Sequence, residues 1–402
     1  MRNKSIIAPE SCTGCGLCAN VCSQNAIHMA WTKDGFLAPE VDTDACTNCG
    51  LCVKQCIALE PTQSYSDDIA SVTSYAGWNR SEKIHIESSS GGVFTALANH
   101  IIQQGGVVYG VVWQNKQTAA FDKAETEQEL ARMRGSKYTP ALPGQVYKNV
   151  LASLKQKRPV LFSGTPCQVH ALYKYLRKPY ENLLTIDIVC HGVPSHLILE
   201  KYIAENEERS KKEIEYISFR DKPEGWQRYH VTKHYKDGSS ESESLDKDIY
   251  MQIFLCDKAL NKACYNCPYA HIPRQGDITL GDYWGVENHH ANWPLDKGIS
   301  AILANTDKGK NALSSINSEL ELIAEPFDKI YQGQGIVYIR PPKQIPGNRS
   351  IVLKKLTRWP LRKVHPLAVD YVKIGSIYMS RTSIIFKVLR FMYRTAKFMK
   401  PR

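Results

Sequence analysis

Short apolar runs alternate with glycine- and serine-containing turns through the middle of the chain. Residues 105–113 are almost continuously apolar, which predicts a buried strand. Two later stretches, 159–176 and 183–203, each read as a strand, a turn and an amphipathic helix. Such units are typical of α/β proteins that bind a ligand at the carboxyl ends of their strands. The pattern therefore predicts a mixed α/β region, in which one helix begins near Cys167.

Other stretches extend this mixed region. Residues 228–234 and 239–244 alternate around an Asp-Gly pair, which predicts a hairpin. The runs at 277–285 and 299–306 predict further strands.

Two turns rich in glycine and serine precede or follow these elements. The turn at residues 88–92 leads into a helix predicted from Val93, whose free backbone N–H groups can hold an anion. A plain helix cap is the simpler interpretation of this turn. The second loop, at 134–140, has Arg134 and Lys137 beside it.

The densest chemical signal lies near the start of the chain. Two runs there have Cys-x2-Cys-x2-Cys-x3-Cys spacing, the pattern of bacterial two-cluster ferredoxins. In that pattern three thiolates of one run hold a cubane, and the fourth crosses to the other cluster. We therefore expect one [4Fe–4S] cluster on Cys12, Cys15, Cys18 and Cys56, and a second on Cys46, Cys49, Cys52 and Cys22.

Zinc and disulfides are the alternatives for these cysteines. Zinc usually takes two separated pairs per site, whereas each run here holds four cysteines within eleven residues. No signal peptide precedes the runs, which argues against disulfides and predicts a cytoplasmic protein. The Pro that normally follows the fourth cysteine is replaced by Ser23 and Ile57. Residues 1–60 are thus predicted to form a ferredoxin-like module that binds two clusters.

Five cysteines remain outside this module: Cys167, Cys190, Cys256, Cys264 and Cys267. The last three lie close together around a Cys-x2-Cys-Pro motif, which indicates a further metal site. A third [4Fe–4S] cluster with Cys190 as the fourth ligand is the favoured interpretation, and zinc on the same thiolates is the alternative. Cys167 is the substitute if Cys190 is not a ligand. The position of Cys167 at a helix start predicts a lowered thiol pKa and a place near the chemistry.

The net charge of +11 is concentrated in the last residues of the sequence. Residues 351–402 hold 13 Lys or Arg and one acid, so the rest of the chain is close to neutral. Within this basic tail, residues 384–399 place apolar and basic side chains on opposite helical faces. Such a helix would lie on an anionic membrane surface, or it would dock on protein with its cations in water. No motif for nucleic-acid recognition accompanies the charge.

A set of short motifs follows in order along the chain: S-S-G-G-V-F-T-A-L, R-G-S-K-Y, S-G-T-P-C-Q, V-C-H-G-V-P-S, F-R-D-K, C-x2-C-P and L-G-D-Y-W-G. Together they resemble the beta-subunit family of coenzyme F420 hydrogenase/dehydrogenase, over roughly residues 1–350. The same family includes the chlorophyll-cycle hydroxymethyl reductase. It also has bacterial members without the deazaflavin, some of them encoded among polysaccharide-synthesis functions.

The resemblance implies a flavin, usually FAD, beside an iron–sulfur cluster. It assigns the flavin contacts to Ser89, Ser90, Gly91, Gly92, Gly135, Ser136, Lys137, Gly164 and Thr165, and the ligands of the inner cluster to Cys190, Cys256, Cys264 and Cys267. The expected order is the ferredoxin module, a linker (61–80), a flavin-binding part (81–160), a second part with the inner cluster (161–350) and the basic tail (351–402).

The leading hypothesis is an oxidoreductase with FAD and three [4Fe–4S] clusters. A ferredoxin-like protein would exchange electrons with the module, and an organic or deazaflavin-type small molecule would exchange hydride with the flavin. Cys167 and His191 are the candidate catalytic residues, although a His that caps a turn is the alternative for His191. A non-catalytic electron-relay subunit and a zinc-stabilised interaction protein are the other classes of function. On the lipid interpretation of the tail, the protein would also be peripheral at the inner membrane face.

Overall fold

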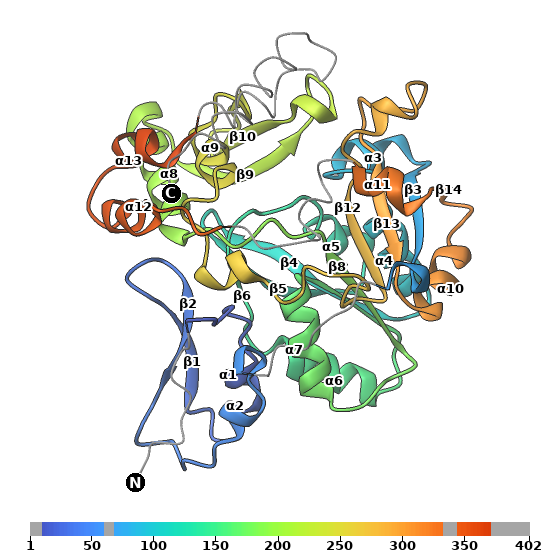
Figure 1. Cartoon of the computed structure of the whole chain (residues 1–402), viewed down its shortest axis with the longest axis horizontal. Helices are drawn as coiled ribbons and strands as arrows, with labels where there is room; N and C mark the ends of the chain where they lie inside the picture. The colour runs from blue at the N-terminus through green and yellow to red at the C-terminus, as the bar shows by residue number, and fades with distance from the viewer. Residues whose placement is uncertain (1–9, 60–67, 333–343, 371–402) are drawn as a thin grey trace, which may run out of the picture.

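The computed structural model describes residues 10–59, 68–332 and 344–370, which form three structural units. A cysteine-rich module comes first and lies at the lower left in Figure 1. A nine-stranded mixed sheet with helices on both faces comes next, and a smaller unit with a three-stranded sheet is inserted between two of its strands. The fold is therefore mixed α/β after a ferredoxin-like module, as the sequence predicts.

The cysteine-rich module combines an antiparallel hairpin with two short helices, each of which carries a cysteine of one run. Each helix starts at a glycine with a left-handed backbone, Gly16 at φ 76° and Gly50 at φ 74°. This conformation costs other residues free energy, so glycine lets the chain turn sharply beside the sulfur atoms. The elements of the module are α1 (Leu17–Val21), β1 (Ile27–Trp31), β2 (Leu37–Val41), α2 (Leu51–Lys54) and the 3-10 turn η1 (Ile57–Leu59).

The nine-stranded sheet has the order β14-β3-β13-β12-β8-β7-β4-β5-β6. Its four central strands, β12, β8, β7 and β4, run parallel, and the flanking pairs are antiparallel apart from β5 and β6. Parallel strands end at the same edge of a sheet, which is where ligands bind in α/β proteins. The strands are β3 (Thr73–Asn79), β4 (Val107–Asn115), β5 (Thr118–Ala124), β6 (Ala141–Leu142), β7 (Val160–Gly164), β8 (Leu183–Ile188), β12 (Ile278–Asp282), β13 (Ser300–Ala304) and β14 (Leu320–Ala324).

Helices cover both faces of this sheet because two separate apolar clusters lie on either side of it. One cluster joins the sheet to α4, α5 and α10, and the other joins it to α6, α7 and the cysteine-rich module through Leu17 and Ile57. The helices of this unit are α3 (Glu82–Glu87), α4 (Val93–Gln103), α5 (Glu127–Ala131), α6 (Val146–Lys155), α7 (Pro166–Leu176), α10 (Asp307–Ser315) and α11 (Phe327–Gln332). Short 3-10 turns are η2 (Ile69–Ser71) and η5 (Val286–Asn288).

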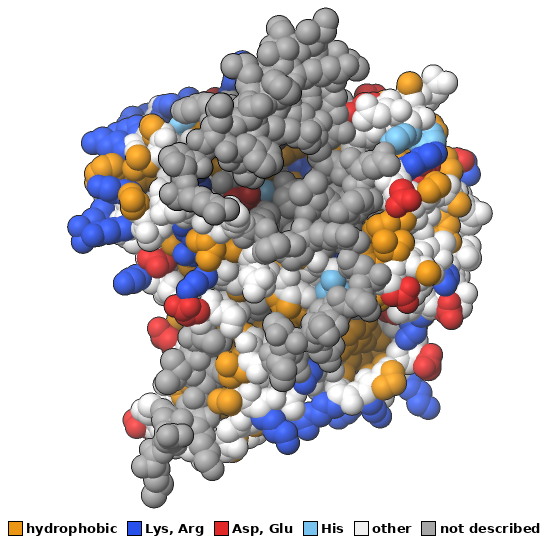
Figure 2. All heavy atoms as spheres, in the orientation of Figure 1, with side chains coloured by type: hydrophobic (Ala, Val, Ile, Leu, Met, Phe, Trp, Pro, Cys, Tyr) orange, Lys and Arg blue, Asp and Glu red, His pale blue; other side chains and the backbone are white. Residues whose placement is uncertain are grey.

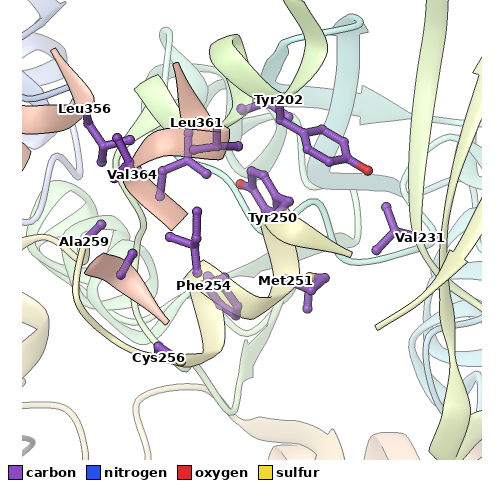
Figure 3. Packing of buried hydrophobic residues seen from close by; sticks show 14 of the residues in the cluster. Tyr202, Val231, Tyr250, Met251, Phe254, Cys256, Ala259, Leu356, Leu361 and Val364 are labelled. Carbon is purple, nitrogen blue, oxygen red and sulfur yellow. The ribbon is translucent and has the colours of Figure 1, made fainter. Parts of the chain in front are cut away.

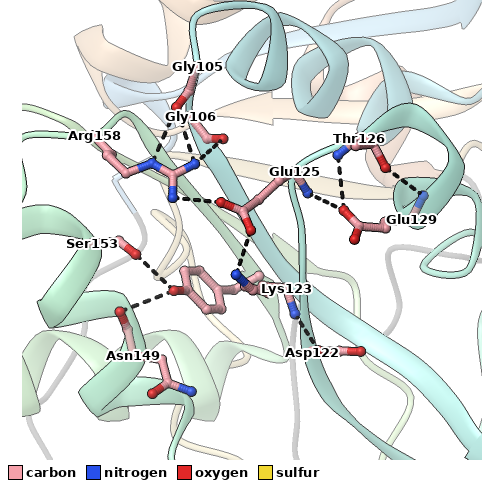
Figure 4. Close-up of polar contacts among 11 residues, drawn as sticks. Gly105, Gly106, Asp122, Lys123, Glu125, Thr126, Glu129, Asn149, Ser153 and Arg158 are labelled. Atoms are coloured by element: carbon pink, nitrogen blue, oxygen red, sulfur yellow. Dashed lines mark hydrogen bonds and ion pairs between the residues drawn. The ribbon is translucent and has the colours of Figure 1, made fainter.

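One edge of the sheet is fastened by a charged cluster (Figure 4). Arg158 donates to Glu125 at 2.6 Å and to the carbonyls of Gly105 and Gly106. Gly105 and Gly106 directly precede β4, and Glu125 directly follows β5. By bonding to all three, the guanidinium holds the start of β4 beside the end of β5.

The smaller unit packs a three-stranded antiparallel sheet against four helices. Its core is one apolar cluster that includes Tyr202, Tyr250, Phe254 and Leu361, several of which Figure 3 shows. The elements are α8 (His196–Ser210), β9 (Ile214–Asp221), β10 (His230–Tyr235), β11 (Ser240–Ser244), α9 (Ile249–Leu255), α12 (Arg349–Leu356) and α13 (Leu361–Ala368), with 3-10 turns η3 (Trp226–Arg228) and η4 (Lys262–Asn266).

The predicted linker differs from the structure in its second half. Residues 73–79, assigned to a linker, form β3, which pairs with both β13 and β14. The strand contains Ser, Thr and Asn, so its sequence does not show the apolar pattern of a buried strand. It is buried because its neighbours in the sheet cover it. The division predicted at residue 160 falls within a single sheet, since strands from both sides of it belong to that sheet.

The predicted basic tail begins within the fold. Val352, Leu356 and Val364 are fully buried in the core of the smaller unit, so α12 and α13 are structural helices. Their outer faces carry Lys and Arg, which gather over this part of the surface in Figure 2. The amphipathic helix predicted at 384–399 lies outside the described residues. Within the described ranges, no helix combines the length and the apolar character needed to cross a bilayer.

Candidate functional site

The first group of ferredoxin cysteines is Cys12, Cys15, Cys18 and Cys56. Burial, together with a smaller contribution from neighbouring thiols, raises the pKa of Cys15 and of Cys18 to about 12. Cys56 contributes to the raised pKa of both Cys12 and Cys18, so the cysteine from the second run lies among those of the first. This is the crossed arrangement that the spacing predicts.

The second ferredoxin group is arranged around α2. Cys52 and Cys22 share a small apolar cluster, and Cys52 also contributes to the raised pKa of Cys18. The backbone N–H of Asn48 donates to Cys46 Sγ at 3.4 Å. Cys49 is exposed, which places this second group toward the outside of the module.

A third group of cysteines forms where the ends of β7 and β8 meet the η4 segment. Cys167 and Cys264 both have a pKa raised by burial and, to a smaller extent, by Cys190 and Cys267. The backbone N–H of Val193 donates to Cys264 Sγ at 3.3 Å. We call Cys167, Cys190, Cys264 and Cys267 the inner cysteine group.

Cys256, a member of the predicted ligand set, is enclosed in the core of the smaller unit. It caps the C-terminal end of α9 inside the apolar cluster of Figure 3 and is 4% exposed. Its sulfur accepts the backbone N–H of Asp370 at 3.2 Å. Cys167, predicted only as a substitute for Cys190, instead lies near both Cys190 and Cys264. It does so because β7 and β8, which lead into Cys167 and Cys190, are adjacent in the sheet. The inner group as we define it therefore has Cys167 where the sequence predicts Cys256.

The prediction of a lowered pKa for Cys167 is also wrong. Burial raises the pKa of this thiol, and the hydrogen-bonding contact with Thr165 Oγ1 at 3.1 Å offsets only part of that effect. Desolvation raises the thiol pKa by more than a position at a helix N-terminus can lower it, because the thiol faces other sulfur atoms rather than water. Cys167 does not line the cavity described below, so its position fits a ligand better than a nucleophile.

Several polar contacts fix the module beside the inner cysteine group. Tyr147 Oη donates to the carbonyl of Cys15 at 2.8 Å, and Asn261 Nδ2 donates to that of Cys12 at 3.1 Å. Cys15, Cys167 and Cys267 pack against the same apolar cluster, and Cys15 contributes to the raised pKa of Cys167, so the first ferredoxin group lies near the inner group. The three groups therefore follow one another from the exposed side of the module inward.

A cavity of about 470 Å³ lies beyond the inner cysteine group. It opens at the carboxyl ends of β7, β8 and β12, and Cys190 and His191 form part of its wall. The start of α4 forms another part, with Gly92 as a left-handed N-cap and without a side-chain cap. A helix start of this kind leaves backbone N–H groups for an anion.

The predicted flavin contacts line this cavity, with one exception. The two Gly/Ser loops meet there, since the N–H of Ser136 donates to Ser89 Oγ at 2.9 Å. Gly91 is the exception: a Cβ on it would lie 2.2 Å from the carbonyl oxygen of Gly77, so this glycine is required for close packing on β3. The residues in the wall are Ser89, Ser90, Gly92, Gly135, Ser136, Lys137, Gly164 and Thr165.

Lys137 is a buried basic residue of the cavity wall. Burial lowers its pKa to about 7. Its Nζ donates to the carbonyls of Arg132, Met133 and Arg134, at 3.2, 3.1 and 2.9 Å. The ammonium therefore also holds the turn at the end of α5, a role that the sequence did not indicate.

His191, which lines the cavity, pairs with Asp257. Its Nε2 lies 2.7 Å from Asp257 Oδ1, and the two side chains are 9% and 15% exposed. The ring also packs on Phe254 at 4.5 Å. The pairing orients His191, and its assignment as a catalytic residue remains a prediction.

The cavity wall also contains polar and aromatic residues that the sequence analysis did not single out. Arg220 forms a fork with Asp282, with Nη1–Oδ2 at 2.8 Å and Nη2–Oδ1 at 3.3 Å. The same Nη1 donates to Tyr138 Oη at 2.9 Å. Arg220 and Asp282 belong to the F-R-D-K and L-G-D-Y-W-G motifs, so the motifs were the signal, but nothing in them indicates that they pair.

The donor chemistry of these sites fits iron–sulfur clusters and a flavin. Among the described residues, no three His, Cys, Asp or Glu side chains are close enough to hold one metal ion. This spacing does not argue against a cubane. A cubane contains four irons and four sulfides, so it holds its thiolates farther apart than a single metal ion does. Within the cavity, the open N-terminal turn of α4 and the buried Lys137 suit the phosphates of a dinucleotide.

Comparison with protein families gives three matches in sequence order. Residues 11–58 match the 4Fe-4S dicluster domain. Residues 74–146 and 157–330 match the coenzyme F420 hydrogenase/dehydrogenase beta subunit, N-terminal and C-terminal models respectively.

Comparison with solved structures finds a chain in a xenon-derivatised F420-reducing [NiFe] hydrogenase complex from Methanosarcina barkeri. The two chains share 16% identity with a TM-score of 0.45, over 72% of this chain and 90% of that chain. Comparison with curated proteins gives no match. On the family matches, the chain is an iron–sulfur redox protein that belongs to the coenzyme F420 hydrogenase/dehydrogenase beta-subunit family.

Proposed function

We propose that this chain is an iron–sulfur flavoprotein oxidoreductase that transfers electrons between a ferredoxin-type protein and a small organic substrate. In this proposal three [4Fe–4S] clusters and one FAD are bound. The observation that carries it is the series of cysteine groups that ends at the cavity. Cys15 of the module contributes to the raised pKa of Cys167 in the inner group, and Cys190 of the inner group forms part of the cavity wall.

The proposed ligand sets follow this series. The outer cluster would be held by Cys22, Cys46, Cys49 and Cys52, the middle cluster by Cys12, Cys15, Cys18 and Cys56, and the inner cluster by Cys167, Cys190, Cys264 and Cys267. The backbone N–H groups of Val193 and Asn48 donate to sulfur, which stabilises thiolate ligands. Tyr147 holds Cys15 in place on the side that faces the inner cluster.

The flavin would occupy the cavity next to the inner cluster. Its phosphates would take the open N-terminal turn of α4, with Lys137 and the joined Ser89 and Ser136 loops around them. A bound flavin supplies the interconversion of one-electron and two-electron chemistry. The chain itself positions the ring system, keeps bulk water from the wall formed by Phe254 and Trp284, and orients His191 through Asp257.

The substrate is an organic or deazaflavin-type molecule, and we propose the cytoplasm as the compartment, where thiolates stay reduced. A role in a polysaccharide-related pathway is the narrower form of this proposal and comes from the resemblance alone. For residues 384–399 we propose contact with anionic lipid. Co-sedimentation with anionic liposomes would be lost in a variant that ends at Gly375, and equal sedimentation of both forms would refute the contact.

Cofactor stoichiometry after anaerobic purification tests the proposal. We expect about twelve irons, an equal amount of acid-labile sulfide and one flavin per chain, at four irons per cubane. About eight irons without flavin would confine the redox chemistry to the module. A colourless protein with stoichiometric zinc would refute the proposal.

The second candidate is an electron-relay subunit that turns over no substrate itself. The family description, which names a beta subunit of a hydrogenase or dehydrogenase, favours it. The two candidates differ in a direct assay: the isolated chain with bound flavin should exchange hydride with a small-molecule reductant if it is an enzyme. A relay subunit would take up electrons and pass them on only to a partner protein.

A further inference from the structure

Tyr138 lines the cavity and has a backbone conformation that is unusual for a tyrosine. Its φ of 48° is left-handed, a conformation that is strained for a bulky side chain and is often found at functional sites. Three neighbours hold it there. Tyr250 Oη donates to its carbonyl at 2.8 Å, and the rings of Phe219 and Phe254 pack edge-on against its ring, at 5.7 and 5.1 Å.

The hydroxyl of Tyr138 accepts a hydrogen bond from a fixed cation. Arg220 Nη1 donates to it at 2.9 Å, and Arg220 is 6% exposed. The guanidinium is held between the rings of Tyr229 and Trp284, at 4.2 and 5.6 Å from their centres. Since the tyrosine oxygen accepts from Arg220, its own hydrogen must point elsewhere, and the charged donor makes that hydrogen a better donor.

The charge of Arg220 is already balanced. Both oxygens of Asp282 accept from its fork, and Trp226 Nε1 approaches Asp282 Oδ1 at 3.4 Å. Trp226 also stacks on Trp284 at 4.3 Å, so the pair is locked between aromatic rings. A carboxylate on the ligand would compete with Asp282 for the same guanidinium, whereas a neutral oxygen needs only the hydroxyl of Tyr138.

Apolar side chains also line the cavity that Tyr138 borders. Trp284, Leu245 and Leu255 are among them, and Tyr138 itself follows Lys137 in the second Gly/Ser loop. A planar ligand would bury its faces against such walls.

We propose that the Tyr138–Arg220–Asp282 cluster is a subsite for the carbonyl oxygen of a planar conjugated organic substrate, with the hydroxyl of Tyr138 as the donor. The proposal names the substrate class for the site of the proposed function, on which it rests. Tyr138 is the residue that touches the substrate, and Arg220 and Asp282 are positioning residues.

Equilibrium dialysis with matched probes tests the subsite on the full chain after anaerobic purification. The probes are 2-acetylnaphthalene, its analogue 2-isopropenylnaphthalene, in which a methylene replaces the oxygen, and the anion 2-naphthoate. We expect the ketone to bind about 2- to 10-fold more tightly than the alkene, the range that one net hydrogen bond supplies. Tyr138→Phe should abolish this preference and leave alkene binding unchanged.

Tyr109→Phe is the matched control. It also removes a buried hydroxyl, which bonds to Ser153 Oγ at 2.9 Å outside the cavity wall, and it should keep the preference for the ketone. Iron content and circular dichroism establish that both variants fold. A preference that survives in Tyr138→Phe, tighter binding of 2-naphthoate, or no binding of any probe would each overturn the subsite.

Flavin content, measured on the same samples, separates this result from the proposed function. A ketone preference that depends on Tyr138 in a protein without flavin would leave the subsite standing and refute the flavoprotein. Bound flavin without that preference would do the reverse.

Discussion

Cys167 and Cys256 both lie at the end of a helix, yet their sulfur atoms have different neighbours. Cys167 is grouped with other thiols, and Cys256 packs among apolar side chains next to the backbone of Asp370. We expect Cys167→Ala to lose about four irons per chain, since a cubane is lost with its ligand. Cys256→Ala should keep its iron and lose about 1–2 kcal/mol of unfolding free energy, because a small core cavity remains.

Iron and acid-labile sulfide assays, with thermal unfolding of the same samples, distinguish these outcomes. Normal iron in Cys167→Ala, together with a loss of about four irons in Cys256→Ala, would restore the ligand set predicted from the sequence.

Lys137 predicts how flavin affinity depends on pH. Burial holds its pKa near 7, about where a small change in pH alters its charge. The lysine carries its proton below that pH and loses it above, so attraction for an anionic phosphate is present at low pH. Affinity for FAD should therefore fall as pH rises through about 7, by up to about tenfold per pH unit.

Fluorescence titration of the flavin-depleted protein with FAD between pH 6 and 9 measures this dependence. Lys137→Arg keeps the charge and should bind equally across the range, apart from any effect of its larger side chain. Lys137→Met should bind more weakly below pH 7 and show no slope. A slope that persists in Lys137→Met would assign the titration to another group.

At the scale of elements, the hairpin of the module is attached to α8. Ser195 Oγ donates to the carbonyl of Asp34 at 2.6 Å, and the N–H of His196 donates to that of Gly35 at 2.8 Å. Trp31 stacks on the His196 ring at 4.2 Å. A Cβ on Gly35 would lie 2.6 Å from Ser195 Oγ, so only glycine allows this close approach. The module is thus held in one position relative to the inner cysteine group.

His196 makes this attachment sensitive to acid. Burial lowers its pKa to about 4, and the carboxylate of Glu200, 3.4 Å away, is the charged group beside it. The folded-state pKa is below the unfolded value near 6.5, so the unfolded state binds more protons and stability falls as pH drops below 6.5. We expect a loss of about 1–2 kcal/mol at pH 5 relative to pH 7.

Hydrogen exchange in the β1–β2 hairpin at pH 5.5 and pH 7 measures this loss. His196→Phe preserves the ring stack without a titrating group and should show little of the acid-induced increase in exchange, after correction for the intrinsic effect of pH. An equal increase in the variant would exclude His196 as the cause.

The elements differ in how well the sequence predicts them. Cysteine spacing is enough for the module, because the ligands of one cubane lie close in sequence, and strand–turn–helix patterns locate β7, α7, β8 and α8. Strand β3 was missed because its pairing with β13 depends on residues more than 200 positions away. Two features of the site also depend on which strands become neighbours. They are the hydrogen bond between Tyr138 and Arg220 and the position of Cys167 in the inner group.

For the whole molecule, the arrangement of cysteine groups defines a direction. Tyr147 and Asn261 contact Cys15 and Cys12 from the larger units, whereas Cys49 is exposed. Under the proposed function, an electron-carrier protein would therefore meet the outer group first, and electrons would reach the inner group through the module. Loss of the outer cluster should then interrupt transfer from a protein donor without removing the flavin.

Cys49→Ala tests this direction. We expect it to lose about four irons, keep its flavin, and slow the reduction of that flavin by a reduced ferredoxin by about tenfold or more. Reduction by dithionite should stay near the wild-type rate, because a small reductant can enter the cavity directly. Cys264→Ala is the comparison and should also slow the ferredoxin reaction. If ferredoxin reduced the flavin normally in Cys49→Ala and slowly in Cys264→Ala, the protein donor would have to approach the inner group itself, and the outer cluster would have no part in the path.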